Sequence, residues 1–517
     1  MTLMAGPLPL IILPLAMTPV VYCLGRWPAA ASLLASVTAL VTASLCLRLP
    51  LNNPVYVLGR ELALDYPGQG VIAFIFITAA ILFFCAWLTS QGPAFDPPPG
   101  AGSAQEGRQA ALNPDTAFIP FGLAILGLLS GVVTMRLFLF AALLLEITAI
   151  VAVFAIQSSQ SRGYAGLGST QAGLKYLTMT ALALPCFLIA AWLFELHARY
   201  PHDTTLAGPT VILLASGFAI LLGAVPFQVW LPSVAVSSPT VMAFLIGTVH
   251  PVLFWLMISL FQRHPWLMAD TRALQILSAG GLVTALVGGL LALSQQDFGR
   301  LLAYAALSDL GCILSVLAMA PTAGPTAAAL PLVHRSLALV LASLGVTTLR
   351  RYAVSDAFAD LSHMARRMPL LSAGLLVGLF SLAGFPLTGG FTSRWPIYYL
   401  AYQENPLYAL ALVLSGGAVA LGCWRGLLAL FGPDTHPELG HEPLPIAIAT
   451  LILTLLCLAW GLFPQLFSSL ILKWIAGVNG HSPLPPNLTS LPIHRYFFHL
   501  PLPVTILQVF MLPSELI

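Results

Sequence analysis

The chain has 517 residues, of which 58% are hydrophobic and only 7% carry a formal charge. A typical globular domain carries charge on roughly a quarter of its residues. The 20 Lys and Arg and 18 Asp and Glu residues are therefore too few to cover the surface of a soluble protein of this length. This composition predicts an all-α, polytopic membrane protein. The net charge of +2 gives no argument for a nucleic-acid partner, and we expect none.

The cysteines give no sign of a metal site or of a disulfide framework. None of the seven belongs to a C-x-x-C pair, and all lie in apolar segments: Cys23, Cys46, Cys85, Cys186, Cys312, Cys423 and Cys457. This pattern argues against iron–sulfur clusters, zinc ribbons and structural disulfides. We therefore expect no cofactor and no metal in this chain.

Fourteen segments are apolar and approach the roughly 20 residues that a membrane-spanning helix needs. In chain order they are 7–25, 28–48, 68–91, 116–134, 136–157, 174–197, 209–230, 238–261, 274–294, 301–320, 326–349, 367–395, 405–431 and 443–464. The first segment lacks the basic start and cleavage site of a signal peptide, so we predict a retained helix. Polar and apolar residues alternate over 49–67, which predicts an extramembrane hairpin. The Pro- and Gly-rich residues 92–115 predict a loop, and the proline-rich tail beyond 479 receives no assignment.

Basic residues in the predicted loops favour one orientation. The loops after odd-numbered helices contain nine Arg and Lys residues, and those after even-numbered helices contain six. This excess predicts that the odd loops are cytoplasmic and that both termini lie outside. The nine are Arg26, Arg108, Arg162, Lys175, Arg300, Arg350, Arg351, Arg366 and Arg367.

Two predicted helices contain an internal proline, Pro226 in the seventh and Pro386 in the twelfth. Proline removes a backbone hydrogen bond and clashes with the preceding turn, so we expect both helices to break. Breaks five helices apart predict two five-helix inverted repeats, an arrangement that forms ion sites near the middle of the membrane. The chain then divides into 1–115 (helices 1–3 and loops), 116–261 (first repeat), 274–431 (second repeat) and 432–517 (last helix and tail). The alternative is that each proline only kinks its helix.

Several ionisable residues fall inside the predicted helices, where a central charge costs roughly 3 kcal/mol or more. They are Glu146, His250, Asp309, His334, Arg335, Arg394 and Arg425, whereas Glu195 and His197 fall near a helix end and are expected to face lipid headgroups. Glu, His and Asp can pass protons when water links them. Arginine stays protonated, so it can only fix a counter-charge or set a barrier. A proton path is the prediction, and a sodium path along carboxylates and freed carbonyls is the alternative.

Three sequence blocks resemble the antiporter-like membrane subunits of respiratory complex I and of the Mrp sodium/proton antiporters. Residues 226–232 read P-F-Q-V-W-L-P and are followed by S-P-T at 238–240, similar to the family's P-F-H-x-W-L-P…A-P-T. Residues 295–304, Q-Q-D-F-G-R-L-L-A-Y, are similar to Q-x-D-x-K-R-x-L-A-Y. Residues 384–394, G-F-P-L-T-G-G-F-T-S-R, are similar to G-x-P-x-x-x-G-F-x-x-K. The resemblance implies the same fold of about 14 helices, with helices 7 and 12 broken.

The resemblance also implies site residues. Glu146 matches the family's glutamate in the fifth helix, and His334 resembles a histidine of the eleventh. The chain departs from the family elsewhere. Leu221 stands where the family has a lysine in the seventh helix, and His250 takes the place of the eighth-helix lysine. Arg394 replaces the lysine or glutamate of the twelfth helix, and Asp309 stands where the family often has His or Gln.

The function implied by the resemblance is that of a proton-translocating membrane-arm subunit of a complex I-like NADH:quinone oxidoreductase, similar to subunit N. Protons would pass along Glu146, His250, Asp309, His334 and water. Such a subunit belongs to a translocase but has no redox site of its own, and quinone reduction elsewhere would drive it. We expect a bacterial inner (cytoplasmic) membrane location, and as partners the lipid bilayer, other membrane-arm subunits and protons, with sodium as the other candidate ion.

Two alternatives stay open. The missing lysines favour a degenerate, non-conducting structural subunit. The shared blocks equally allow an Mrp-type cation/proton antiporter subunit, or a subunit of a membrane hydrogenase or of an inorganic-carbon uptake system.

Overall fold

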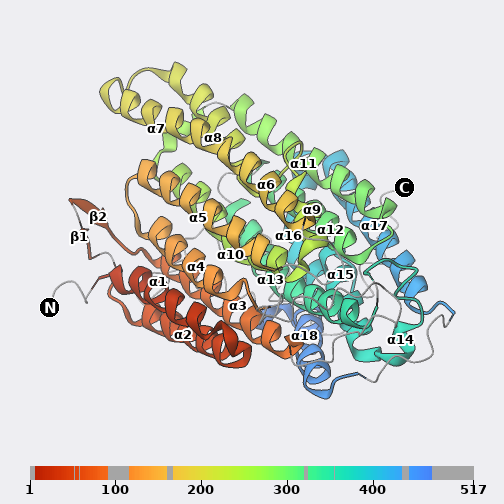
Figure 1. Cartoon of the computed structure of the whole chain (residues 1–517). Coiled ribbons are helices and arrows are strands. Elements are labelled where there is room, and N and C mark those ends of the chain that lie inside the picture. Colours follow the sequence, from red (N-terminus) through yellow and green to blue (C-terminus); the bar gives the residue numbers. More distant parts are fainter. Residues whose placement is uncertain are drawn as a thin grey trace.

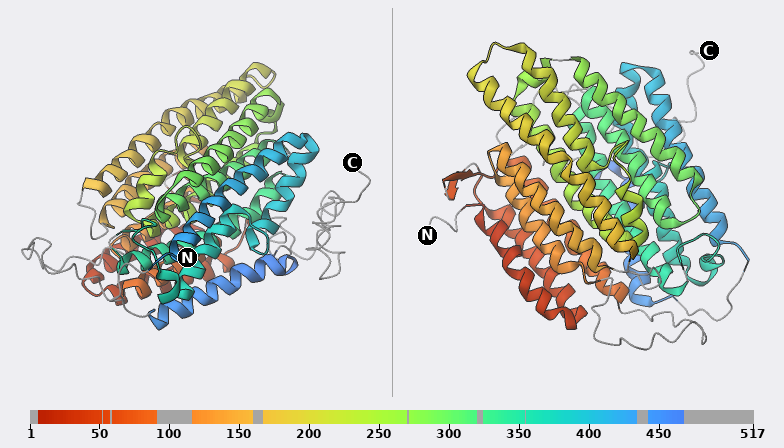
Figure 2. Two further views of the ribbon diagram at one scale, coloured as in Figure 1. Left: turned by 90° about the vertical axis from the view of Figure 1, so that its right-hand side faces the viewer. Right: turned by 45° about the horizontal axis from the view of Figure 1, so that its top comes forward.

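The computed structural model describes residues 6–51, 53–57, 59–90, 116–159, 167–269, 271–319, 324–353, 355–433 and 442–467. The predicted loop at 92–115 and the tail beyond 479 lie outside these residues. The helices run side by side in one bundle, with α1 to α3 on one flank and α11 and α17 on the other (Figure 1). They stay aligned along a common direction in the two further views (Figure 2).

The helices follow the predicted segments closely in chain order. The first half contains α1 (Leu8–Cys23), α2 (Pro28–Arg48), α3 (Tyr66–Ser90), α4 (Ile119–Thr134), α5 (Phe138–Ser158), α6 (Leu167–Ala181), α7 (Ala183–Arg199), α8 (Ala207–Leu222), α9 (Trp230–Ser237) and α10 (Pro239–Arg263). The second half contains α11 (Thr271–Ser294), α12 (Phe298–Met319), α13 (Gly324–Leu349), α14 (Met364–Arg367), α15 (Pro369–Ala383), α16 (Gly389–Glu404), α17 (Pro406–Leu430) and α18 (Leu444–Leu462).

The prediction of an all-α, polytopic membrane architecture is confirmed. Within the described residues, 11 helices are long and apolar enough to cross a membrane, and the apolar helices α4, α8 and α15 are shorter. The count of fourteen spans stays a prediction because those three helices are below the usual spanning length. The hairpin predicted in 49–67 is present: β1 (Val55–Val57) pairs antiparallel with β2 (Arg60–Leu62), and Gly59 takes a positive φ of 73° at the turn.

The sixth predicted segment began too late. The apolar stretch runs from residue 168 to 199 as α6 and α7, whereas the prediction began at 174. The polar residues Ser169, Thr170 and Gln171 lowered the hydropathy there, although they form the first turns of α6. Lys175 was therefore assigned to a loop, and this assignment was wrong: it lies inside α6.

The helical conformation is interrupted at the two places where proline was noted. We call the segment between α8 and α9 the first break and that between α15 and α16 the second break. After α8, Gly223 adopts a left-handed φ of 68° and Ala224 N–H donates to the Ala219 carbonyl at 2.8 Å. After α15, Gly384 adopts a φ of 75° and Phe385 N–H donates to the Phe380 carbonyl at 3.0 Å. Both ends are glycine caps of the Schellman type. The two helices thus end four and three residues before Pro226 and Pro386, which lie in the irregular segments and are exposed.

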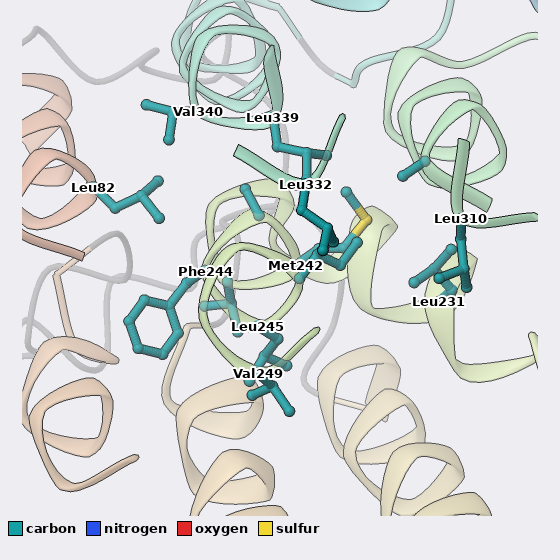
Figure 3. Close-up of a cluster of buried hydrophobic side chains, with 14 of the residues drawn as sticks. Leu82, Leu231, Met242, Phe244, Leu245, Val249, Leu310, Leu332, Leu339 and Val340 are labelled. Carbon is teal, nitrogen blue, oxygen red and sulfur yellow. The ribbon is translucent and has the colours of Figure 1, made fainter. Parts of the chain in front are cut away.

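Helix α10 lies at the centre of the bundle. In its most apolar window 94% of the residues are buried, the highest share of any candidate span in the described part of the chain. Met242 of α10 lies beside Leu332 of α13, whereas Phe244 and Val249 project from other sides of the same helix (Figure 3). Because α10 is enclosed on all sides, a polar residue in it meets protein and not lipid.

A buried ion pair joins three helix ends. Arg350, directly after α13, donates from Nη1 to the Val236 carbonyl of α9 at 2.8 Å, and its Nη2 lies 2.9 Å from Asp356 Oδ2. The same Asp356 oxygen accepts from the backbone N–H of Gly299 at 2.9 Å, in the first turn of α12. A Cβ at position 299 would come within 2.5 Å of that oxygen, so glycine is needed for this contact.

Replacing Asp356 should therefore destabilise the bundle. Asp356→Ala leaves Arg350 buried without a counter-charge, and removing one partner of a buried pair costs about 3–5 kcal/mol. Asp356→Asn keeps an acceptor for Gly299 and should cost less. The measurement is the midpoint of thermal unfolding in detergent, with the exposed Glu404→Ala as the control. Equal midpoints for Asp356→Ala and Glu404→Ala would contradict the assignment.

Candidate functional site

Three charged side chains from three helices meet inside the bundle: Asp309 of α12, Arg335 of α13 and Arg394 of α16. Arg394 donates to Asp309 Oδ1 from Nε at 2.9 Å and from Nη2 at 2.6 Å. Arg335 Nε lies 3.3 Å from Asp309 Oδ2. All three side chains are 5% exposed or less. We call this group the ionic cluster. With one carboxylate and two guanidiniums it has a formal charge of +1.

Arg394 also occupies the end of a broken helix. Its Nη1 donates to the Ala383 carbonyl at 3.0 Å, and its Nη2 donates to the Leu382 carbonyl. These carbonyls belong to the last turn of α15, where no following helical turn supplies N–H donors. The C-terminal end of a helix also carries a partial negative charge. The arginine therefore supplies the donors that the carbonyls at the end of α15 lack.

His334 connects α13 to two other helices. Its Nε2 lies 3.0 Å from Ser381 Oγ of α15 and 3.5 Å from Cys457 Sγ of α18. Ser381 Oγ also accepts from the backbone N–H of Gly390 at 3.3 Å, at the start of α16. His334 is thus held beside the second break, one residue along α13 from the ionic cluster.

His250 lies in the middle of α10 and is only 2% exposed. Neither of its ring nitrogens has a hydrogen-bond partner among the described residues. Arg335 is the charged group that acts on it electrostatically. Buried polar atoms are nearly always paired with protein or ordered water, so the unpaired nitrogens of His250 set it apart from His334.

Glu146 belongs to a second group, near the first break. It is half-buried on α5, and its charge acts on Tyr176 of α6. The ring of Tyr176 packs edge-on against Trp230 of α9, with centroids 5.0 Å apart. The neighbouring Lys175 donates from Nζ to Ser233 Oγ of α9 at 3.1 Å. No hydrogen bond or ion pair between described residues joins Glu146 to the ionic cluster.

The remaining sequence-derived residues take no part in either group. Leu221 is an apolar core residue of α8, with 9% exposure. Arg425 lies inside α17, as the sequence indicated, but it is exposed there and donates to the Leu293 carbonyl. Pro226 and Pro386 are exposed in the two interrupted segments.

Comparison with known proteins shows the family to which this chain belongs. Residues 135–419 match the family model described as "NADH:quinone oxidoreductase/Mrp antiporter, TM". The matched region includes both breaks, the ionic cluster and Glu146. The chain belongs to this family and is an integral membrane protein.

Its curated relatives include NADH-quinone oxidoreductase subunit N of Chromohalobacter salexigens, 31% identical over 293 residues, covering 52% of this chain and 60% of the relative. Subunit N 2 of Acidobacterium capsulatum is 28% identical over 468 residues, covering 83% and 88%. The alignments span only 58–64% of the first three relatives.

Solved structures show the same fold. Respiratory complex I from Thermus thermophilus contains a chain with a TM-score of 0.70 at 20% identity, covering 91% of this chain and 99% of that one. The Mrp complex from Dietzia sp. contains one with a TM-score of 0.74 at 18% identity, covering 92% and 98%.

The ionic cluster makes a prediction about stability that depends on which charge is removed. Asp309→Asn leaves two buried guanidiniums with no counter-ion, which should cost about 3–5 kcal/mol. Arg335→Met leaves the Asp309–Arg394 pair intact and should cost less. Thermal unfolding midpoints of the two purified variants give the order. If Arg335→Met were the more destabilised, Asp309 would not be the residue that holds the cluster together.

Proposed function

We propose that this chain is the subunit N-like, proton-translocating membrane-arm subunit of a complex I-like NADH:quinone oxidoreductase in the bacterial cytoplasmic membrane. The observation that carries the proposal is the pair of polar groups beside the two breaks, one around Glu146 and Lys175 and one around Asp309. Its partners would be the other membrane-arm subunits of that assembly. This chain would pass protons and carry no electrons.

The two groups suggest how the chain divides. We assign the first repeat to helices α4 to α10 and the second to α11 to α17, each with one break and one cluster of ionisable residues. The equivalent glycine caps at Gly223 and Gly384 support this division. Protons would enter near Glu146, pass His250 and reach His334 and Ser381 by way of water.

Lys175 supplies a cation in the first repeat. The position expected for a lysine holds Leu221, yet Lys175 reaches Ser233 on α9 from the neighbouring helix. It is one of two lysines in the chain. A carboxyl group and an amine are both side-chain groups that can bind and release a proton.

Arg394 differs from Lys175 in its chemistry. Because a guanidinium does not release its proton, Arg394 fixes charge and does not relay. This feature also favours the second candidate function, that of a non-conducting subunit which completes the membrane arm.

Pumping by the assembled complex separates the two functions. In reconstituted vesicles, Glu146→Gln should slow proton transfer through this chain about tenfold, the effect of roughly 1.4 kcal/mol on a transfer step, and so lower the proton uptake that accompanies quinone reduction. The control is Glu195→Gln, at an exposed position near the end of α7. Unchanged pumping by an intact Glu146→Gln complex would favour the non-conducting subunit.

Lys175 gives a second, independent test. Lys175→Met should lower proton uptake to a similar extent, because Ser233 of α9 then loses its ammonium partner. Lys175→Arg keeps the charge but cannot release a proton, so it should stay as low as Lys175→Met if Lys175 relays. Recovery with arginine would assign Lys175 a purely electrostatic effect. Identification of the co-purifying subunits in mild detergent tests the assembly itself.

A further inference from the structure

The Arg394 guanidinium is surrounded by oxygen atoms from three helices. It donates to the carbonyls of Leu382 and Ala383 and to the carboxylate of Asp309. The Tyr398 hydroxyl, one turn further along α16, lies beside the same guanidinium. We call these four oxygen-bearing groups the oxygen cage.

Two glycines make room for this cage. A Cβ at Gly384 would lie 3.1 Å from Arg394 Nη1 and 3.3 Å from Tyr398 Oη. A Cβ at Gly416, on α17, would lie 2.6 Å from the Ala383 carbonyl oxygen and 3.5 Å from Arg394 Nη1. The space is thus lined by backbone and oxygen atoms on the sides where a side chain would otherwise intrude.

The chemistry of the cage is that of an alkali-cation site. Carboxylate, carbonyl and hydroxyl oxygens are the ligands that hard metal cations prefer. In membrane transporters, unwound backbone and the C-terminal ends of half-helices coordinate Na⁺. Here the last carbonyls of α15 point at the same place, and a cation is already there, attached to the protein.

We propose that Arg394 is a tethered cation which occupies an alkali-cation site and so excludes Na⁺ from this subunit. Arg394 is then a specificity-determining residue for the transported ion. The charge balance defines the ion that would replace it. Arg335 stays beside Asp309 when Arg394 is neutralised, so one monovalent cation restores the cluster to +1, whereas a divalent cation would make it +2.

The role in ion specificity rests on the proposed translocation, but its test does not, because sodium binding can be measured in a complex that pumps or does not pump. Three variants of the purified assembly are compared by saturable ²²Na⁺ binding. Arg394→Gln opens the cage and should bind one more Na⁺ per chain than the unsubstituted protein. Arg394→Lys keeps a tethered cation and should bind no additional Na⁺.

The double variant Asp309→Asn/Arg394→Gln lacks the carboxylate and should also bind no additional Na⁺. A second readout is the unfolding midpoint, which should rise with NaCl but not with choline chloride in Arg394→Gln alone. Arg394→Ser is a second variant that opens the cage, for use if the complex with Arg394→Gln does not assemble. It must show the same sodium dependence. Sodium binding by an opened variant no greater than by Arg394→Lys would overturn the proposal.

Discussion

The arrangement of the second half of the bundle depends on one constraint: a carboxylate buried in a membrane protein must be paired. Asp309 is paired twice, with Arg394 on one oxygen and Arg335 on the other. Transfer of any one of these ions out of water costs several kcal/mol, which the attraction between them offsets only when the geometry is good. The pairing therefore fixes the positions of α12, α13 and α16 relative to one another. It also fixes α15, because Arg394 donates from Nη1 and Nη2 to the last carbonyls of that helix.

The two breaks share a glycine cap but differ in the side chain that packs against it. Each begins with a glycine in the left-handed conformation, and each glycine is covered by one large side chain of the following helix. At Gly223 this is Trp230, whose Nε1 would lie 2.7 Å from an added Cβ. At Gly384 it is Arg394. The first break is thus filled by an aromatic ring, with its cation Lys175 held on a neighbouring helix, whereas the second is filled by a cation of its own.

Much of the fold could be predicted from the sequence, because hydropathy and length report directly on helices in lipid. The locations of all the long helices followed from this pattern. The helix α9 was missed, since eight residues between a break and a proline are too short to register as a span. Lys175 was misplaced because the small polar residues before it resemble a loop. The double pairing of Asp309 could not be predicted, since its partners are 26 and 85 positions away and nothing in the local pattern connects them. The sequence placed Arg335 inside a helix, but only the structure shows that it pairs with Asp309.

The ionic cluster restricts what His250 can do. A proton on this histidine places a second positive charge next to Arg335, within a group whose formal charge is already +1. Coulomb repulsion is strong where the surroundings are apolar, so the positive charge of the cluster opposes a further positive charge on His250. Asp309 is held by Arg394 on one side but has a single contact, 3.3 Å long, with Arg335 on the other. Within the cluster, Arg394 is bound to three acceptors, whereas Arg335 meets Asp309 through one longer contact.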